Sequence, residues 1–158
     1  MKLKFKIQQY QTDAVENVVR VFDGQPNLGL LEYKIDHGKV YVEVGGKRVE
    51  VKEFEYDEED TGYKNGDIVL DEETLLKNIH HIQTESNIHL SSDVVKKLGH
   101  CQLDVEMETG TGKTYVYIKT LFELNKRYGW TKFIVVVPSV AIREGVKKSF
   151  DITADHFM

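Results

Sequence analysis

The sequence has little of what a membrane or secreted protein needs. Its 158 residues include a single cysteine, Cys101, and no apolar run approaches the roughly 18 to 20 residues of a membrane span. One cysteine cannot form an internal disulfide, so the fold has to be stabilised by packing of its core. Lysine alternates with apolar residues over 2–7, which excludes the apolar core of a signal peptide. We therefore expect a cytoplasmic protein with no membrane partner.

An excess of positive charge is also missing. The formal net charge is -5 at pH 7, and residues 24–101 carry nine basic and sixteen acidic side chains, a net charge of -7. Six of these acidic side chains crowd into residues 53–60, a stretch that would repel a phosphate backbone and is typical of a solvated loop. The charge pattern therefore argues against a generally basic nucleic-acid-binding domain. The 41% of hydrophobic residues are enough to bury a core.

Two helices and a hairpin are predicted before residue 84. Apolar residues at helical spacing predict an amphipathic helix over 8–23, and residues 39–44 and 47–54 alternate with period two around a Gly-Gly pair, as a β-hairpin does. Residues 57–67 are rich in acid and glycine and predict a loop. Asp71 is then placed to cap a second helix. Residues 84–101 carry no clear pattern.

The last third changes to an alternation of strand and helix. Residues 103–107 predict a strand, residues 113–128 predict a helix that ends at Gly129, and the apolar run over 133–137 is typical of a parallel strand covered on both faces. Pro138 and the residue after it end that run and begin another helix. Alternation of this kind predicts a parallel sheet.

A glycine-rich loop joins the first of these strands to the helix after it. In a phosphate-binding loop, glycines turn backbone N–H groups toward an oxyanion, a lysine reaches the outer phosphates, and a Ser or Thr hydroxyl coordinates magnesium. The general signature has a glycine where this sequence has Met107, and a chance glycine turn is the plain alternative. The strand before the loop and the helix after it favour the phosphate-binding interpretation. The loop residues are Glu108, Thr109, Gly110, Thr111, Gly112, Lys113 and Thr114.

Together with two further segments, the glycine-rich loop resembles a known protein family. Residues 107–115 followed by residues 135–145 resemble motifs I and Ia of the Res subunit of type III restriction enzymes, which belong to the superfamily 2 helicases. Residues 9–14, Gln-Tyr-Gln-Thr-Asp-Ala, are similar to the stretch in which that superfamily contacts adenine, and the match gives that role to Gln11. The resemblance also implies that Pro138 and Ser139 face a DNA backbone. The plain alternatives are a polar residue on an exposed helix face for Gln11 and a helix cap for Ser139.

The resulting prediction is an α/β fold, a partial RecA-like parallel sheet with an inserted subdomain of β-hairpin and helix. Residues 1–23 form the adenine-contacting helix, residues 24–101 the accessory insertion, and residues 102–158 the first part of the ATPase lobe. We expect Gln11 and the loop at Lys113 to lie on the same edge of that sheet, at opposite ends of one nucleotide. An amide that donates to a ring nitrogen of adenine and accepts from its amine does not suit guanine, so ATP should be preferred over GTP.

The resemblance implies a function for a longer parent protein. It would bind ATP and Mg²⁺, translocate on double-stranded DNA, and cleave it together with a methyltransferase partner. The acidic motif, second lobe and nuclease domain of such an enzyme are not recognisable here, so we expect this chain to be an N-terminal fragment that is inactive alone. The alternatives are another P-loop phosphotransferase or GTPase, and a nucleotide-sensing module without catalysis.

Two weaker signals point elsewhere and are set aside. Histidines and Cys101 are scattered without the tight spacing of a zinc site. The basic pairs at 126–127 and 147–148 fall in last turns of predicted helices, where positive charge complements the helix dipole, which favours a structural role over a nucleic-acid patch.

Overall fold

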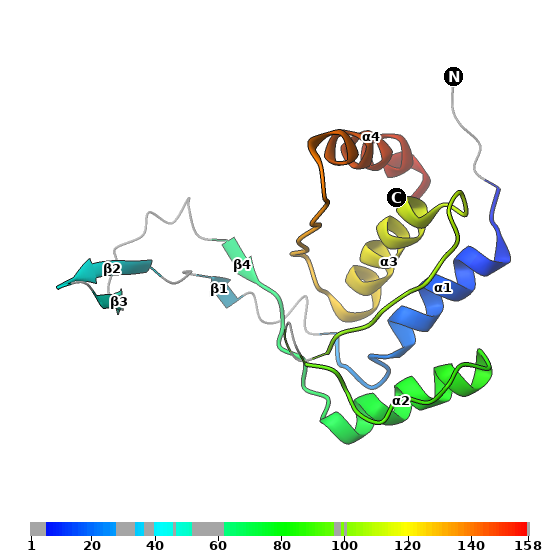
Figure 1. Cartoon of the computed structure of the whole chain (residues 1–158), viewed down its shortest axis with the longest axis horizontal. Helices are drawn as coiled ribbons and strands as arrows, with labels where there is room; N and C mark the ends of the chain where they lie inside the picture. The colour runs from blue at the N-terminus through cyan, green and yellow to red at the C-terminus, as the bar shows by residue number, and fades with distance from the viewer. Residues whose placement is uncertain are drawn as a thin grey trace.

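Four helices form the body of the protein. The computed structural model describes residues 6–27, 34–36, 40–45, 47–51, 62–96, 99 and 101–157. Figure 1 shows the helices gathered on one side of the molecule, with α1 between α2 and α3. None of the described helices is long and apolar enough to cross a membrane. The helices are α1 (Gln9–Arg20), α2 (Glu72–Glu85), α3 (Lys113–Tyr128) and α4 (Val140–Phe157).

Short antiparallel strand pairs make up the rest of the regular structure. Strands β2 (Val40–Val44) and β3 (Lys47–Val51) pair around Gly45, whose φ of 61° suits the tight turn. Strands β1 (Lys34–Asp36) and β4 (Gly62–Lys64) pair nearer the helices, and Figure 1 shows the β2–β3 hairpin lying farther out. The acidic stretch over 53–60, the outer ends of the predicted hairpin strands and His100 lie outside the described residues.

The predicted parallel sheet is wrong for the part of the chain that the structure describes. Residues 103–107 and 133–137 form no strand there, and the described strands are all antiparallel. A buried parallel strand needs neighbours at both edges and covering layers on both faces. The apolar run at 133–137 pairs with no described strand, and much of it is uncovered, since Ile134 is 92% and Val136 87% exposed.

Helix ends follow the local signals in the sequence. Asp71 caps α2, and its side chain accepts a hydrogen bond from the backbone N–H of Thr74 at 2.7 Å. Hydrogen bonding with Thr74 lowers the pKa of the Asp71 carboxyl group. Gly129 ends α3 in the left-handed conformation with φ 72°, and its N–H donates to the carbonyl of Asn125. Both ends were predicted from the residues alone.

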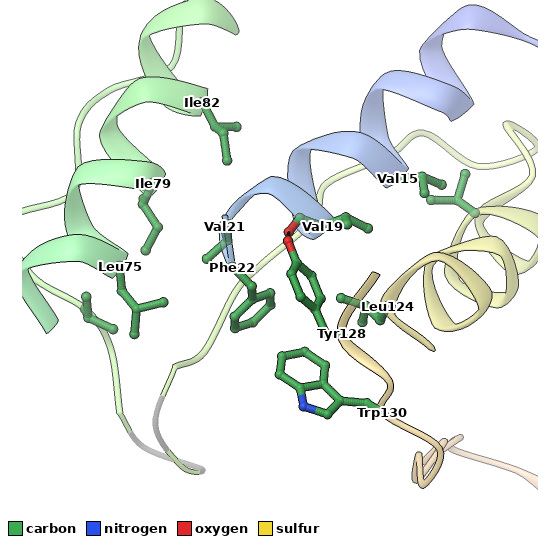
Figure 2. Packing of buried hydrophobic residues seen from close by; sticks show 12 residues of the cluster. Val15, Val19, Val21, Phe22, Leu75, Ile79, Ile82, Leu124, Tyr128 and Trp130 are labelled. Carbon is green, nitrogen blue, oxygen red and sulfur yellow. Dashed lines mark hydrogen bonds between the residues drawn. The ribbon is translucent and has the colours of Figure 1, made fainter. Parts of the chain in front are cut away.

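The core lies where α1, α2 and α3 meet, so α2 shares one core with α1 although it belongs to the predicted insertion. Figure 2 shows the aromatic rings of Phe22, Tyr128 and Trp130 grouped beneath α1. The ring centroids of Phe22 and Trp130 lie 5.1 Å apart with their planes nearly perpendicular. The buried hydrophobic cluster comprises Val15, Val19, Val21, Phe22, Leu75, Ile79, Ile82, Val94, Val116, Leu124, Tyr128 and Trp130.

A polar clamp ties the segment after β4 to the segment after α3. The side-chain oxygen of Asn65 accepts from the backbone N–H groups of Thr131 and Lys132, and its amide donates to the Lys132 carbonyl at 2.7 Å. The indole N–H of Trp130 donates to the carbonyl of Gly66 at 3.1 Å. These bonds fix the position of residues 65–66 against the helical core.

Candidate functional site

The glycine-rich loop opens α3. Gly110 and Gly112 both have positive φ angles, 84° and 87°, and Gly112 is the residue before the first turn of the helix. The hydroxyl of Thr111 donates to the Glu108 carbonyl at 2.6 Å, which closes the turn. Backbone N–H groups at a helix start have no partner within the helix and attract anions. The structure thus places the predicted loop residues at the start of a helix, with two glycines in the left-handed conformation.

Lys113 folds back onto the loop. Its ammonium donates to the carbonyl oxygens of Met107 at 2.9 Å and Glu108 at 2.8 Å. The lysine side chain therefore closes the segment between residues 107 and 113. An anion bound at the loop would compete with these two carbonyl oxygens for the same ammonium.

The first turn of α1 contacts the loop directly. The amide of Gln11 donates to the carbonyl oxygen of Thr111 at 2.8 Å, and the hydroxyl of Tyr10 donates to the same oxygen at 3.2 Å. The structure thus brings Gln11 into direct contact with the loop across about a hundred residues of sequence, neither along a sheet edge nor at the far end of a nucleotide from the loop, the two features that were predicted. Sequence reasoning missed Tyr10, because nothing in its local pattern marks a contact so distant in the chain.

The remaining loop threonines and the next residue are placed around the helix start. Thr109 is exposed in the loop, and Thr114 is half-buried in the first turn of α3. The hydroxyl of Tyr115 lies 3.1 Å from Nε2 of His156 in α4, and burial raises the pKa of that tyrosine. Among the described residues, no group of three His, Cys, Asp or Glu side chains forms a metal site.

Pro138 and Ser139 lie away from the loop. The contact between Tyr115 and His156 brings the last turn of α4 to the first turn of α3, so Ser139 is at the far end of α4. Eighteen helical residues span about 27 Å. The hydroxyl of Ser139 accepts from the N–H of Ile142 at 3.3 Å, which is the capping contact, and both Pro138 and Ser139 are exposed. The DNA contact stays a prediction.

An acidic cleft of about 770 Å³ runs from the loop between α1, α2 and residues 102–108. Tyr10 and Thr111 lie on its lining, and its apolar residues include Val18 and Ile79. Its charged lining residues all carry negative charge, which would repel a phosphate chain, so a nucleotide would approach the loop from another side. The acidic lining residues are Asp13, Asp93, Asp104, Glu106 and Glu108.

These contacts define a protein with a helical core, in which a glutamine of the first helix contacts a glycine-rich loop at the start of α3. The family follows from comparison with known proteins. Residues 4–156 match the family described as "Type III restriction enzyme, res subunit", so the chain belongs to this family. The resemblance drawn from the motifs is confirmed.

Curated relatives carry the same description. The chain is 41% identical over 95 residues to the "Type III restriction-modification enzyme EcoP15I Res subunit" of Escherichia coli, covering 59% of this chain and 10% of that protein. It is 42% identical over 83 residues to the StyLTI Res subunit of Salmonella typhimurium, covering 50% of this chain and 8% of the relative. The chain therefore spans about a tenth of the length of these relatives. No solved structure matches it.

Proposed function

We propose that this chain supplies the ATP-binding loop of a type III restriction Res subunit. The observation that carries the proposal is the contact between Gln11 and Thr111, which joins the predicted adenine contact to the predicted phosphate loop. Gly110, Gly112, Lys113 and Thr109 would surround the phosphates with N–H groups, a hydroxyl and one ammonium. The whole enzyme, with its methyltransferase partner, would use the bound ATP to translocate on DNA and cleave it.

The residues present fit ATP and leave part of the magnesium shell to the nucleotide. Positive φ at Gly110 and Gly112 gives the loop the conformation in which successive N–H groups converge. Magnesium prefers six oxygen ligands, and the Thr114 hydroxyl would supply one of them beside the phosphate oxygens. Bound ATP and magnesium would supply the phosphoanhydride bond and the charge neutralisation for hydrolysis.

The proposal also includes a contact with DNA, at a part of the fold that is separate from the loop. Exposed Pro138 and Ser139 precede the N-terminus of α4, where free N–H groups would favour a phosphate of the DNA backbone. The net negative charge of the chain makes its own affinity for DNA weak and sensitive to salt. The division into residues 1–23, 24–101 and 102–158 is part of the same proposal.

Calorimetry of ATP with magnesium against this chain tests the proposal. We expect measurable binding, no tighter than micromolar, because the proposed contacts come from one loop and one glutamine. Lys113→Ala should weaken it at least about tenfold through loss of a charged hydrogen bond, while Lys147→Ala, which removes an exposed lysine from α4, should not. Absence of binding by the wild-type chain, or equal weakening by both variants, contradicts the proposal.

A further inference from the structure

Two side chains of α1 converge on one backbone oxygen of the loop. The carbonyl oxygen of Thr111 accepts from the hydroxyl of Tyr10 at 3.2 Å and from the amide of Gln11 at 2.8 Å. A carbonyl oxygen has two lone pairs, so the two α1 donors account for both acceptor positions. The resemblance assigns a role to Gln11 and none to Tyr10.

The direction of this carbonyl fixes the direction of a neighbouring N–H. In a trans peptide the C=O of one residue and the N–H of the next point in opposite directions. The described part of the chain has no cis peptide bond. With the Thr111 oxygen held toward α1, the N–H of Gly112 points away from α1, at the start of α3 where an anion would be bound.

The peptide between Thr111 and Gly112 needs such a support. Gly112, which has a positive φ, supplies the N–H of this peptide. Glycine populates both signs of φ almost equally, so the peptide is less restricted at Gly112 than it would be at a larger residue. The two hydrogen bonds from α1 restrict the rotation of this peptide.

We propose that Tyr10 is a positioning residue of the loop, whose hydroxyl holds the Thr111 carbonyl so that the Gly112 N–H faces the nucleotide phosphates. This inference rests on the proposed function and extends it to a residue outside the motifs. The carbonyl that Tyr10 holds belongs to the phosphate end of the site. Tyr10 therefore acts on every ligand with a phosphate chain, whichever base that ligand carries.

A purely structural role for the Tyr10 hydroxyl would be redundant. The α1 helix is already fixed to α3 by the buried side chains of Val15 and Val19, and by an ion pair of Glu16 with Arg127 at 2.6 Å. Tyr10 itself is 49% exposed. Removing its hydroxyl should leave the packing of α1 unchanged and affect the loop alone.

Calorimetry on this chain with tripolyphosphate, ATP and GTP separates the two roles. Tyr10→Phe should weaken all three ligands by the same factor, about three- to tenfold, the effect of one lost hydrogen bond. The ratio of ATP to GTP affinity and the melting temperature should not change. Tyr117→Phe is the matched control for the ligand affinities, though not for the melting temperature, because the Tyr117 hydroxyl makes no hydrogen bond with the described residues.

A nuclear magnetic resonance measurement without any ligand completes the test. Tyr10→Phe should shift the carbonyl resonance of Thr111, and Tyr117→Phe should leave that resonance unchanged. If the wild-type chain binds the probes and Tyr10→Phe binds them equally well with an unmoved Thr111 carbonyl, the role of Tyr10 is refuted and the proposed function stands. If the wild-type chain binds none of them, the proposed function fails, and the Thr111 resonance alone decides on Tyr10. A changed ratio of ATP to GTP also refutes the role.

Discussion

The side-chain amide of Gln11 lies against the backbone of Gly112, at the place where a larger residue would carry its side chain. A β-carbon built on Gly112 would be 2.5 Å from Nε2 of Gln11, closer than real contacts of this kind. Gly112 also has a φ of 87°, which side chains disfavour. The φ angle therefore favours glycine here, and a β-carbon would also have to displace the far end of the flexible Gln11 side chain.

Gly112→Ala should destabilise the chain more than Gly110→Ala. Both residues have positive φ, but a β-carbon at Gly110 would meet nothing within 4 Å. The backbone strain at each position costs about 1 kcal/mol, and displacing the Gln11 amide from its hydrogen bond with Thr111 should add about 1 kcal/mol at Gly112. Free energies of unfolding in urea measure both.

The double variant Gln11→Ala with Gly112→Ala tests whether Gln11 causes the difference in stability between the two glycine variants. Removing the amide should bring the cost of Gly112→Ala down to that of Gly110→Ala, because only the backbone strain is left. If the cost of Gly112→Ala is the same with and without Gln11, the close approach of α1 to the loop is disproved.

Gln11 should also decide between adenine and guanine. Its NH₂ group has two hydrogens, and the bond to Thr111 uses one of them. The second hydrogen can donate to a ring nitrogen while the oxygen accepts from the exocyclic amine of adenine, whose positions guanine reverses. Calorimetry should show ATP bound more tightly than GTP by the wild type, and equally by Gln11→Ala. Equal affinities in the wild type would remove the adenine role.

Signals contained in a few neighbouring residues were enough to predict the helices. Asp71 caps α2 because its side chain reaches the N–H three residues on, and Gly129 ends α3 because glycine adopts the left-handed conformation. The glycine-rich loop was found in the same way. Each of these features depends on residues within one or two helical turns, which the sequence displays directly.

Features that depend on distant partners could not be predicted in the same way. The apolar run at 133–137 has the composition of a buried strand, yet a strand also needs hydrogen-bonding neighbours, and the described residues provide none there. Tyr10 and Asn65 look like ordinary polar residues of a helix start and a loop. Their hydrogen bonds to Thr111 and to residues 131–132 join segments that are 101 and 66 or 67 residues apart.

Tyr117→Phe should stabilise the protein. The hydroxyl of Tyr117 is buried on α3 and makes no hydrogen bond with any described residue. A buried polar group without a partner loses its hydration and gains nothing in return, so removing it should raise the free energy of unfolding by about 1 kcal/mol. Urea denaturation of the two proteins measures the difference. A loss of stability would mean that the hydroxyl bonds to a partner.

Tyr128 should make stability depend on pH in alkaline solution. It is 6% exposed, its hydroxyl donates to the carbonyl of Val19 at 2.9 Å, and the carboxylate of Asp23 lies 3.4 Å away. Burial first, and then the charge of Asp23, raise the pKa of Tyr128 from 10.0 to about 12.

The sign of this pH dependence follows from whether the folded or the unfolded chain holds the Tyr128 proton more tightly. The folded protein keeps the Tyr128 proton to a higher pH than the unfolded chain, so this contribution to stability is complete below pH 10 and is lost as the pH rises from 10 to about 12. A shift of this size corresponds to about 2 to 3 kcal/mol.

Tyr128→Phe should lose about 1 kcal/mol of stability near neutral pH, through the missing bond to Val19, and its free energy of unfolding should then fall less steeply than that of the wild type above pH 10. Other tyrosines and the lysines titrate in both proteins, so the difference between their unfolding free energies isolates Tyr128. Parallel curves across this range would show that the phenol is not held protonated by the fold.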